Sequence, residues 1–138
     1  MKLAFILDPL EHLKAYKDSS VAMMREAARR GHAGHAFEAR SLDVHGGTVR
    51  CRAAPISLTD DDDNWYAPAG PVPEARVADF ERVFMRKDPP FDQEYYYATL
   101  LLERAEAEGA RVVNSPRALR DWNEKLSILR FPQFTPAT

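Results

Sequence analysis

Residues 80–92 read FERVFMRKDPPFD, and this stretch joins an apolar run to a charged exit. Its first six residues are typical of a buried β-strand. The strand ends in Arg86, Lys87 and Asp88, and two prolines follow at once. Because the pyrrolidine rings restrict the backbone, we expect the preceding side chains to be held at the end of the strand.

A helix is predicted directly after this exit, over residues 93–108. Asp92 can cap its first turn, and Gly109 supplies the stop. Phe91 precedes the cap and is placed to pack on Tyr96 as a hydrophobic staple. Helical spacing predicts an inner stripe of Tyr97, Leu101 and Ala105.

The same strand-then-helix order occurs at the start of the chain. Residues 2–7 (KLAFIL) predict a strand. Asp18 can cap a helix that extends to Arg30, and the inner face of this helix carries Val21, Met24 and Ala28. Further strands are expected at 34–39 and 110–113, with short helices opened by Ser115-Pro116 and by Asn123 through Ile128.

Two stretches interrupt this alternation. Gly46-Gly47 lies between two β-prone runs and predicts a two-residue hairpin, since both turn positions need positive φ. Residues 58–73 contain four consecutive acids, Asp60 to Asp63, and three prolines, and are predicted to form an exposed loop. The order favours an α/β domain with a mostly parallel sheet, helices on both faces and a β-hairpin insertion.

Composition excludes several protein classes. The 138 residues suffice for one domain with its own core, and 45% apolar with 29% charged residues is normal for a globular protein. The net charge is -2 and no apolar run is long enough for a membrane span, so neither nucleic acid nor membrane is an expected partner. A single cysteine, Cys51, without a secretion signal predicts a reducing, cytoplasmic location.

Polar residues at strand ends are the main site candidates, because ligands of parallel sheets bind at the carboxyl ends of strands. Arg86 can clamp a carboxylate with two hydrogen bonds, and Asp88 can pair with Arg86 or with a substrate ammonium. Asp18 and Ser19 can bind an anion at a helix start, although their spacing alone favours a cap. An internal ion pair at the sheet edge explains the Arg-Lys-Asp exit equally well.

The remaining polar residues are weaker candidates for a functional site. The four histidines lack metal-ligand spacing, and Cys51 has no obvious base beside it. The acids at 60–63 are interpreted as a solvated loop. Neither GxxxxGK[ST] nor GxGxxG occurs, which removes two common phosphate cradles.

Several stretches together resemble one family. ILDPLEHLKAYKDSSVAMMREAARRGH (residues 6–32) and FMRKDPPFDQEYYYATLLLERAEAEGARVVNSPRALRDWNEKL (residues 84–126) resemble the amino-terminal third or so of prokaryotic-type glutathione synthetase, an ATP-grasp ligase. The resemblance is weakest from Leu42 to Val77. It implies a Rossmann-like pre-ATP-grasp domain at 1–122, the start of the ATP-grasp region at 123–138, and a chain that continues beyond Thr138.

The resemblance also implies a reaction. Such enzymes use ATP and Mg²⁺ to convert the cysteinyl carboxylate of γ-glutamylcysteine to an acyl phosphate, which glycine then attacks. The amino-terminal domain supplies part of the substrate-binding wall and contacts of a homo-oligomer, and Lys125 matches the first of the nucleotide-phosphate lysines. A chain without the remaining phosphate- and Mg²⁺-binding groups is expected to be inactive alone.

Two alternatives stay open. The chain could be the front domain of another ATP-grasp carboxylate-amine ligase with a different acceptor. It could also be a non-catalytic ligand-binding α/β module.

Overall fold

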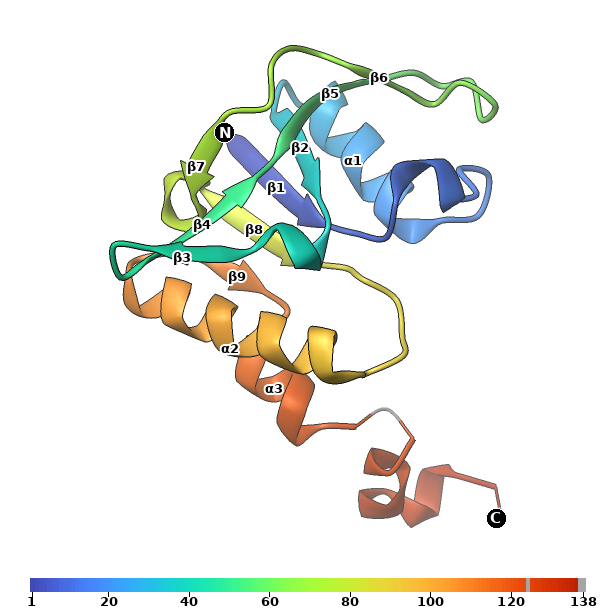
Figure 1. Cartoon of the computed structure of the whole chain (residues 1–138). Helices are drawn as coiled ribbons and strands as arrows, with labels where there is room; N and C mark the ends of the chain where they lie inside the picture. Colours follow the sequence, from blue (N-terminus) through green and yellow to red (C-terminus); the bar gives the residue numbers. More distant parts are fainter. Residues whose placement is uncertain (124, 137–138) are drawn as a thin grey trace.

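A computed structural model describes residues 1–123 and 125–136 and shows a mixed α/β domain (Figure 1). In the described residues the larger sheet has six strands in the order β6-β5-β2-β1-β8-β9. β2, β1, β8 and β9 are parallel, whereas β5 and β6 are antiparallel to their neighbours. In that order the strands span Tyr66–Pro68, Ala54–Leu58, Ala33–Phe37, Lys2–Ile6, Arg82–Met85 and Val112–Val113.

A smaller antiparallel sheet has the order β3-β4-β7, over Asp43–His45, Thr48–Arg52 and Glu74–Arg76. Gly46 and Gly47 form the turn between β3 and β4 with φ of 58° and 77°, which confirms the predicted hairpin. The α-helices are α1 (Ser19–Arg29), α2 (Gln93–Ala107) and α3 (Pro116–Asp121). Short 3-10 helices lie at Leu10–His12, Ala39–Ser41, Val77–Asp79, Ser127–Arg130 and Pro132–Phe134.

The large sheet is covered on both faces, as predicted. Side chains alternate along β1, so Leu3 and Phe5 pack in a cluster with α1, whereas Ala4 and Ile6 pack in a cluster with α2 and the small sheet. The hairpin therefore adds to the layer that holds α2. Glu108 joins the two elements, since its carboxylate accepts the Val49 amide at 3.1 Å.

The predicted caps are present. Asp18 accepts from the amides of Ser20 and Val21, and Asp92 accepts from Tyr95. Ser115 accepts from the Ala118 amide, with Pro116 in the first turn of α3. Each helix begins where the sequence predicts because these short polar side chains satisfy free amides.

Both predicted helix faces need a partial correction. In α1, Val21 and Met24 are buried, but Ala28 is exposed and Ala27 takes its place against the core. In α2, Tyr97 is 62% exposed, and the buried face carries Tyr95, Ala98, Thr99, Leu102 and Ala105. The predicted contact of Phe91 with Tyr96 is present as an edge contact of the two rings at 6.4 Å, and the Phe91 ring also lies 4.8 Å from the ring of the buried Tyr95.

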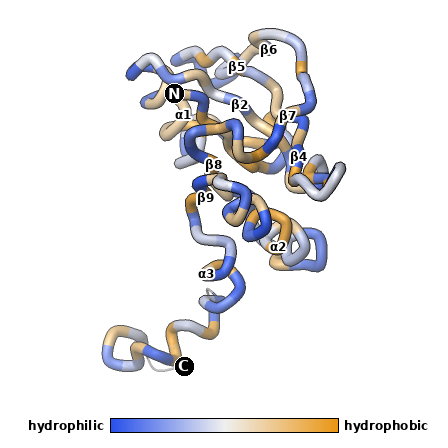
Figure 2. The backbone as a smooth tube through the Cα atoms, turned by 90° about the vertical axis from the view of Figure 1, so that its left-hand side faces the viewer, coloured by the Kyte–Doolittle hydropathy of each residue, from blue (hydrophilic) through white to orange (hydrophobic). Residues whose placement is uncertain are grey.

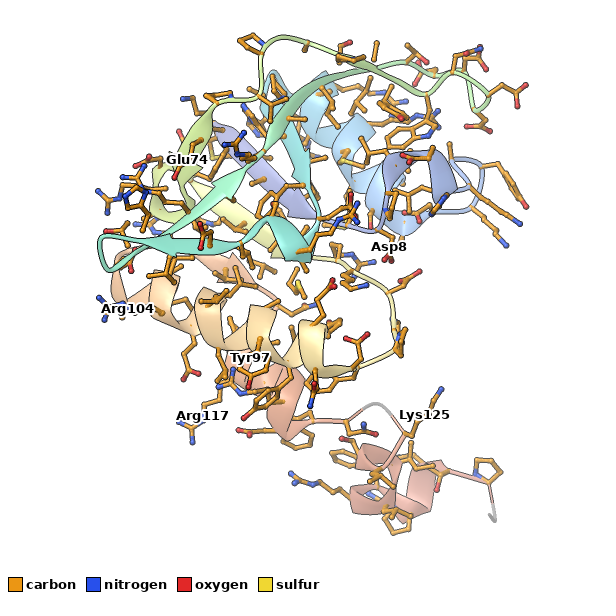
Figure 3. All side chains as sticks on the ribbon, in the orientation of Figure 1. Asp8, Glu74, Tyr97, Arg104, Arg117 and Lys125 are labelled. Carbon is orange, nitrogen blue, oxygen red and sulfur yellow. The ribbon has the colours of Figure 1, made fainter. Side chains whose placement is uncertain are left out.

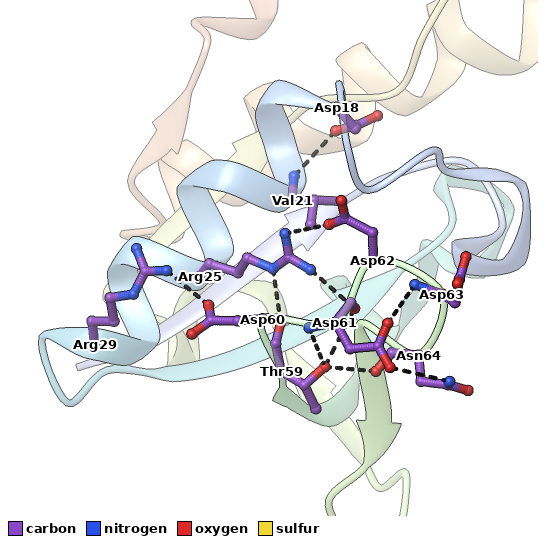
Figure 4. A network of polar contacts seen from close by, with 10 residues as sticks. All are labelled: Asp18, Val21, Arg25, Arg29, Thr59, Asp60, Asp61, Asp62, Asp63 and Asn64. Atoms are coloured by element: carbon purple, nitrogen blue, oxygen red, sulfur yellow. Dashed lines mark hydrogen bonds and ion pairs between the residues drawn. The ribbon is translucent and has the colours of Figure 1, made fainter.

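The exposed loop predicted for residues 58–73 is also partly wrong. β5 and β6 pair across it, and Trp65 between them is 4% exposed. The acids at 60–63 do lie at the surface, but arginines of α1 hold them in place (Figure 4). Arg25 donates to Thr59 O, Asp61 O and Asp62 Oδ1, and Arg29 pairs with Asp60.

The chain after α3 departs from the expected last helix. Asn123 Oδ1 accepts from the Lys125 and Leu126 amides, so the cap is present, but a turn and a 3-10 helix follow it. Position 124 of the expected helix lies outside the described residues. The segment projects from the body of the domain and carries several hydrophobic residues (Figure 2).

Candidate functional site

The exits of β1 and β8 lie side by side at the centre of the large sheet. Ile6 pairs with Met85 in register, so the residues that follow each strand start level with one another. α1 follows β1 on one face of the sheet, and α2 follows β8 on the other. The two exit loops therefore turn to opposite faces of the sheet. Open α/β sheets bind ligands at such a switch point, here called the crevice.

Arg86 crosses this crevice. Its Nε donates to Ser20 Oγ at 3.1 Å and its Nη2 donates to Ser19 Oγ at 2.7 Å. Its backbone amide donates to Ile6 O at 2.9 Å, which extends the β1–β8 ladder by one residue. The side chain is half-buried and anchored to the first turn of α1.

The start of α1 serves two purposes. Oδ1 of Asp18 accepts from Ser20 and Val21 at 2.7 and 3.1 Å, so this oxygen acts as the helix cap. Ser19 and Ser20 direct their hydroxyls to Arg86. A guanidinium held at a helix N-terminus gathers positive potential at one point, which suits an anionic ligand.

Lys87 turns the other way from Arg86. Its Nζ donates to Asp8 Oδ1 at 3.0 Å, and Asp8 Oδ2 accepts the Asp88 amide at 3.1 Å. The internal ion pair considered from the sequence therefore exists, but it joins Lys87 to Asp8. Throughout the part of the chain described, no ion pair joins Arg86 to Asp88, and the Asp88 side chain is exposed.

The Lys87–Asp8 pair changes the pKa of Lys87. Burial by itself lowers the pKa of Lys87, but the hydrogen bond and the charge of Asp8 outweigh it. The pKa of Lys87 therefore lies above its ordinary value of 10.5. Lys87 stays charged at neutral pH and fixes the exit loop that presents Arg86.

Lys125 lies apart from this crevice, on the segment after α3 (Figure 3). It lines a pocket of about 410 Å³ together with aromatic side chains of Phe91, Tyr95 and Trp122. Arg120, also in the lining, is bound to Glu103 and to Thr99. Pro89, from the proline pair at the β8 exit, borders the same pocket.

Cys51 is not placed for nucleophilic chemistry. Its side chain is 1% exposed, and burial, with the nearby charge of Asp79, raises the pKa of the thiol to about 12. A thiol with that pKa stays protonated at neutral pH. Among the residues that the structure describes, no group of three His, Cys, Asp or Glu side chains could hold a metal ion. No helix in the same part of the chain is long and apolar enough to cross a membrane.

The structure thus brings three of the predicted residues, Asp18, Ser19 and Arg86, to one point. Asp88 follows two residues after Arg86 and its side chain is exposed, whereas Lys125 lies apart. Sequence reasoning did not predict the contact of the Ser20 hydroxyl with Arg86 or the anchoring roles of Asp8 and Lys87. Asp8 follows β1 directly, so its position was visible, but its partner lies 79 residues away and depends on the strand register.

Comparisons with known proteins agree on one family. The sequence model of the prokaryotic glutathione synthetase N-terminal domain matches residues 1–120. A glutathione synthetase of Nitrosomonas europaea is 53% identical over 139 residues, covering 99% of this chain and 43% of that protein. Those of Bordetella pertussis and Salmonella typhimurium are 50% and 45% identical, covering all of this chain and 45% and 44% of theirs. The chain thus spans less than half the length of these relatives.

Proposed function

Because the chain belongs to the family of prokaryotic glutathione synthetase N-terminal domains, we propose that it forms the substrate-facing wall of a cytoplasmic, ATP-dependent carbon–nitrogen ligase. The full-length protein joins γ-glutamylcysteine to glycine and consumes ATP. Relatives named glutathione synthetase are more than twice as long as this chain. The described domain contributes binding and orientation, and the residues beyond it contribute phosphoryl transfer.

The contact of Arg86 with the two serines carries this proposal. A guanidinium has five N–H donors, and two are used by Ser19 and Ser20, so three remain for a ligand. A peptide-like substrate with several carboxylates needs such donors, since a buried carboxylate without a partner is costly. We assign a substrate carboxylate to Arg86 and Ser19, and a substrate ammonium to Asp88. Asp18 keeps the helix start in place beside them.

The reaction requires the substrate to be held, not only bound. The cysteinyl carboxylate attacks the γ-phosphorus of ATP, ADP leaves, and the glycine amine then displaces phosphate from the acyl carbon. Each step is faster when the dipeptide is fixed in one orientation. Arg86, held by α1 and by the β1–β8 ladder, supplies that fixation with little freedom to lose on binding.

Nucleotide binding is assigned in part to Lys125. Lys125 lines a pocket with several aromatic side chains, and it stands at the position where the resemblance implies a phosphate-binding lysine. The described residues do not fit Mg²⁺, since no suitable carboxylate cluster occurs among them. We therefore assign the Mg²⁺ ligands to the longer protein and derive no step through the ion from these residues.

Substrate dependence of the full-length protein tests the function. ADP release is measured with γ-glutamylcysteine, glycine, ATP and Mg²⁺, omitting one component at a time. Turnover that needs all four supports the proposal. Free replacement of glycine by other amines favours a different carboxylate-amine ligase, and no ADP release at all favours a binding module.

Arg86→Ala tests the site in the same assay. We expect the KM for γ-glutamylcysteine to rise about 10- to 100-fold, the loss of one or two charged hydrogen bonds, with a much smaller change for ATP. Arg82→Ala is the matched control, because Arg82 lies at the start of the same strand and donates to Glu81 O. An unchanged KM for the dipeptide would return Arg86 to a purely structural role.

Lys125→Ala tests the nucleotide assignment separately. We expect the KM for ATP to rise about tenfold or more, the cost of one phosphate contact, while the KM for the dipeptide changes little. Arg117→Ala, on exposed α3, is the control. Nucleotide binding that is unaffected by Lys125→Ala would refute this role.

A further inference from the structure

A second pocket lies next to the crevice, at the exits of β1 and β2. Its volume is about 280 Å³, and its floor is apolar, formed by Leu7, Ala36 and Phe37. Because Phe37 pairs with Ile6, the loops after both strands rise together at its rim. The pocket shares Asp8 with the Lys87 contact described above and includes none of Asp18, Ser19, Arg86 or Asp88.

Not every charged side chain at this rim has an ion-pair partner among the described residues. Three acids, Asp8, Glu11 and Glu38, and two cations, Arg40 and Arg52, line the pocket. Asp8 is paired with Lys87, and Glu38 is paired with Arg40 at 2.7 Å. Glu11 and Arg52 remain, and neither has an ion-pair partner within 4.0 Å in the described part of the chain.

The lining also holds an unused hydroxyl. Ser41 Oγ is buried and has no hydrogen-bond partner among the described residues. A buried polar atom without a partner is uncommon in folded proteins and calls for an explanation. Ser41 lines this pocket from the 3-10 helix that follows β2.

From this lining we infer that the pocket is a binding site for an α-amino-acid head group, in which an ammonium and a carboxylate share one carbon. Arg52 and Ser41 bind the carboxylate, and Glu11 binds the ammonium, supported by the Glu38 carboxylate. The apolar floor lies under the Cα side of the ligand. Because Arg52 and Glu11 have no ion-pair partner among the described residues, the rim offers a ligand one cation and one acid, which suits a zwitterion. A ligand that carries only negative charge would lie close to three carboxylates.

Two ligands carry this chemistry. One is a free amino acid, and the other is the γ-glutamyl end of a dipeptide that reaches from the crevice. Only the second rests on the proposed function. The pocket and the crevice are separable, since the residues named for each are different.

Binding to the chain itself is the test, followed by amide chemical shifts in NMR spectra. L-Glutamate, glutarate (no ammonium), 4-aminobutyrate (no α-carboxylate) and γ-glutamylcysteine are titrated up to about 10 mM, where millimolar affinities are resolved. We expect L-glutamate to shift the signals around Glu38, Ser41 and Arg52, and the two truncated ligands to bind at least about tenfold more weakly.

Variants separate the pocket from general charge effects. Arg52→Gln and Glu11→Gln are each expected to weaken L-glutamate binding about tenfold, whereas Arg117→Gln on α3 leaves it unchanged. If γ-glutamylcysteine shifts these signals together with those of Ser19 and Arg86, the head group belongs to the dipeptide. If only L-glutamate shifts them, the pocket takes a free amino acid.

The inference is overturned if no ligand shifts the pocket signals, or if glutarate binds as well as L-glutamate. It is also overturned if both variants bind like the unchanged chain. None of these results depends on turnover, so the ligase function can fail while the pocket holds, and the reverse.

Discussion

Arg86 and Lys87 are neighbours in the sequence, but their side chains make different contacts. Arg86 reaches the serines of α1, whereas Lys87 binds Asp8 at the exit of β1. The sequence predicted that this strand end carries the polar chemistry. It could not divide the two roles, because the division follows from the β1–β8 register and from the alternation of side chains across the sheet.

The first prediction at this scale concerns Lys87→Met. Lys87 is 15% exposed in its side chain, so losing it leaves Asp8 partly buried without its cation. We expect the free energy of unfolding to fall by about 1–2 kcal/mol at pH 7, between the values for surface and buried pairs. The raised pKa of Lys87 implies that the pair contributes fully below pH 10.5 and is lost as the pH rises through that raised pKa.

Urea unfolding of the two chains at pH 7 checks this value. Lys14→Met, an exposed lysine in the loop before α1, is the control for removing a charge. Equal stability of Lys87→Met and the unchanged chain would mean that Asp8 holds the exit through the Asp88 amide alone.

Cys51 gives a second prediction, on pH dependence. The unfolded thiol ionises near its ordinary value of 9.0, whereas the folded thiol keeps its proton to about pH 12. The contribution of the protonated Cys51 thiol to the free energy of unfolding is therefore fully present below pH 9. Above pH 9 this contribution decreases by up to about 1.4 kcal/mol per pH unit. Urea unfolding of the unchanged chain and of Cys51→Ala at pH 7, 9 and 10 isolates the effect. Two pH profiles that run parallel would show that Cys51 does not contribute it.

At the scale of elements, the sequence located what short polar residues and glycines decide. Both glycines of the hairpin and all three helix caps occur where predicted. The strands β5, β6 and β7 were missed, because prolines and acids dominate that stretch. Pro68 is tolerated since it ends β6 at the edge of the sheet, and Trp65 supplies apolar contact that the surrounding composition hides.

The clasp between α1 and the acidic loop allows a matched prediction at this scale. Arg25 is 15% exposed and donates three hydrogen bonds to residues 59–62, whereas Arg29 is 60% exposed and pairs only with acids (Figure 4). We expect Arg25→Ala to cost about 1–3 kcal/mol of stability and Arg29→Ala less than about 1 kcal/mol. Chemical unfolding measures both values, and amide exchange over residues 59–64 locates the loss. Similar costs for the two variants would mean that the loop is held by its own turns.

At the scale of the whole molecule, the alternation of strands and helices was sufficient to predict the parallel sheet. β1 goes to the centre because its neighbours on the two sides, β2 and β8, are reached by connections that run in opposite directions. That arrangement places the site between the β1 and β8 exits. Strand β7, which completes the small sheet, and the second pocket could not be predicted, since both depend on how the segment between β2 and β8 folds back over one face.

The segment after α3 carries the last prediction. Both core clusters draw on residues up to Leu119, and none of the described residues beyond it belongs to them. Trp122, Leu126, Leu129, Phe131 and Phe134 are instead largely exposed, the last by 82%. Cutting the chain after Asp121 should therefore change the free energy of unfolding by less than about 1 kcal/mol, since little buried apolar area is lost. It should also reduce binding of a hydrophobic dye and any self-association, because exposed apolar patches drive both. Thermal unfolding and sedimentation of the two chains test both expectations. Loss of cooperative unfolding in the shorter chain would show that the segment belongs to the core. Unchanged self-association would show that the associating surface lies on the remaining domain.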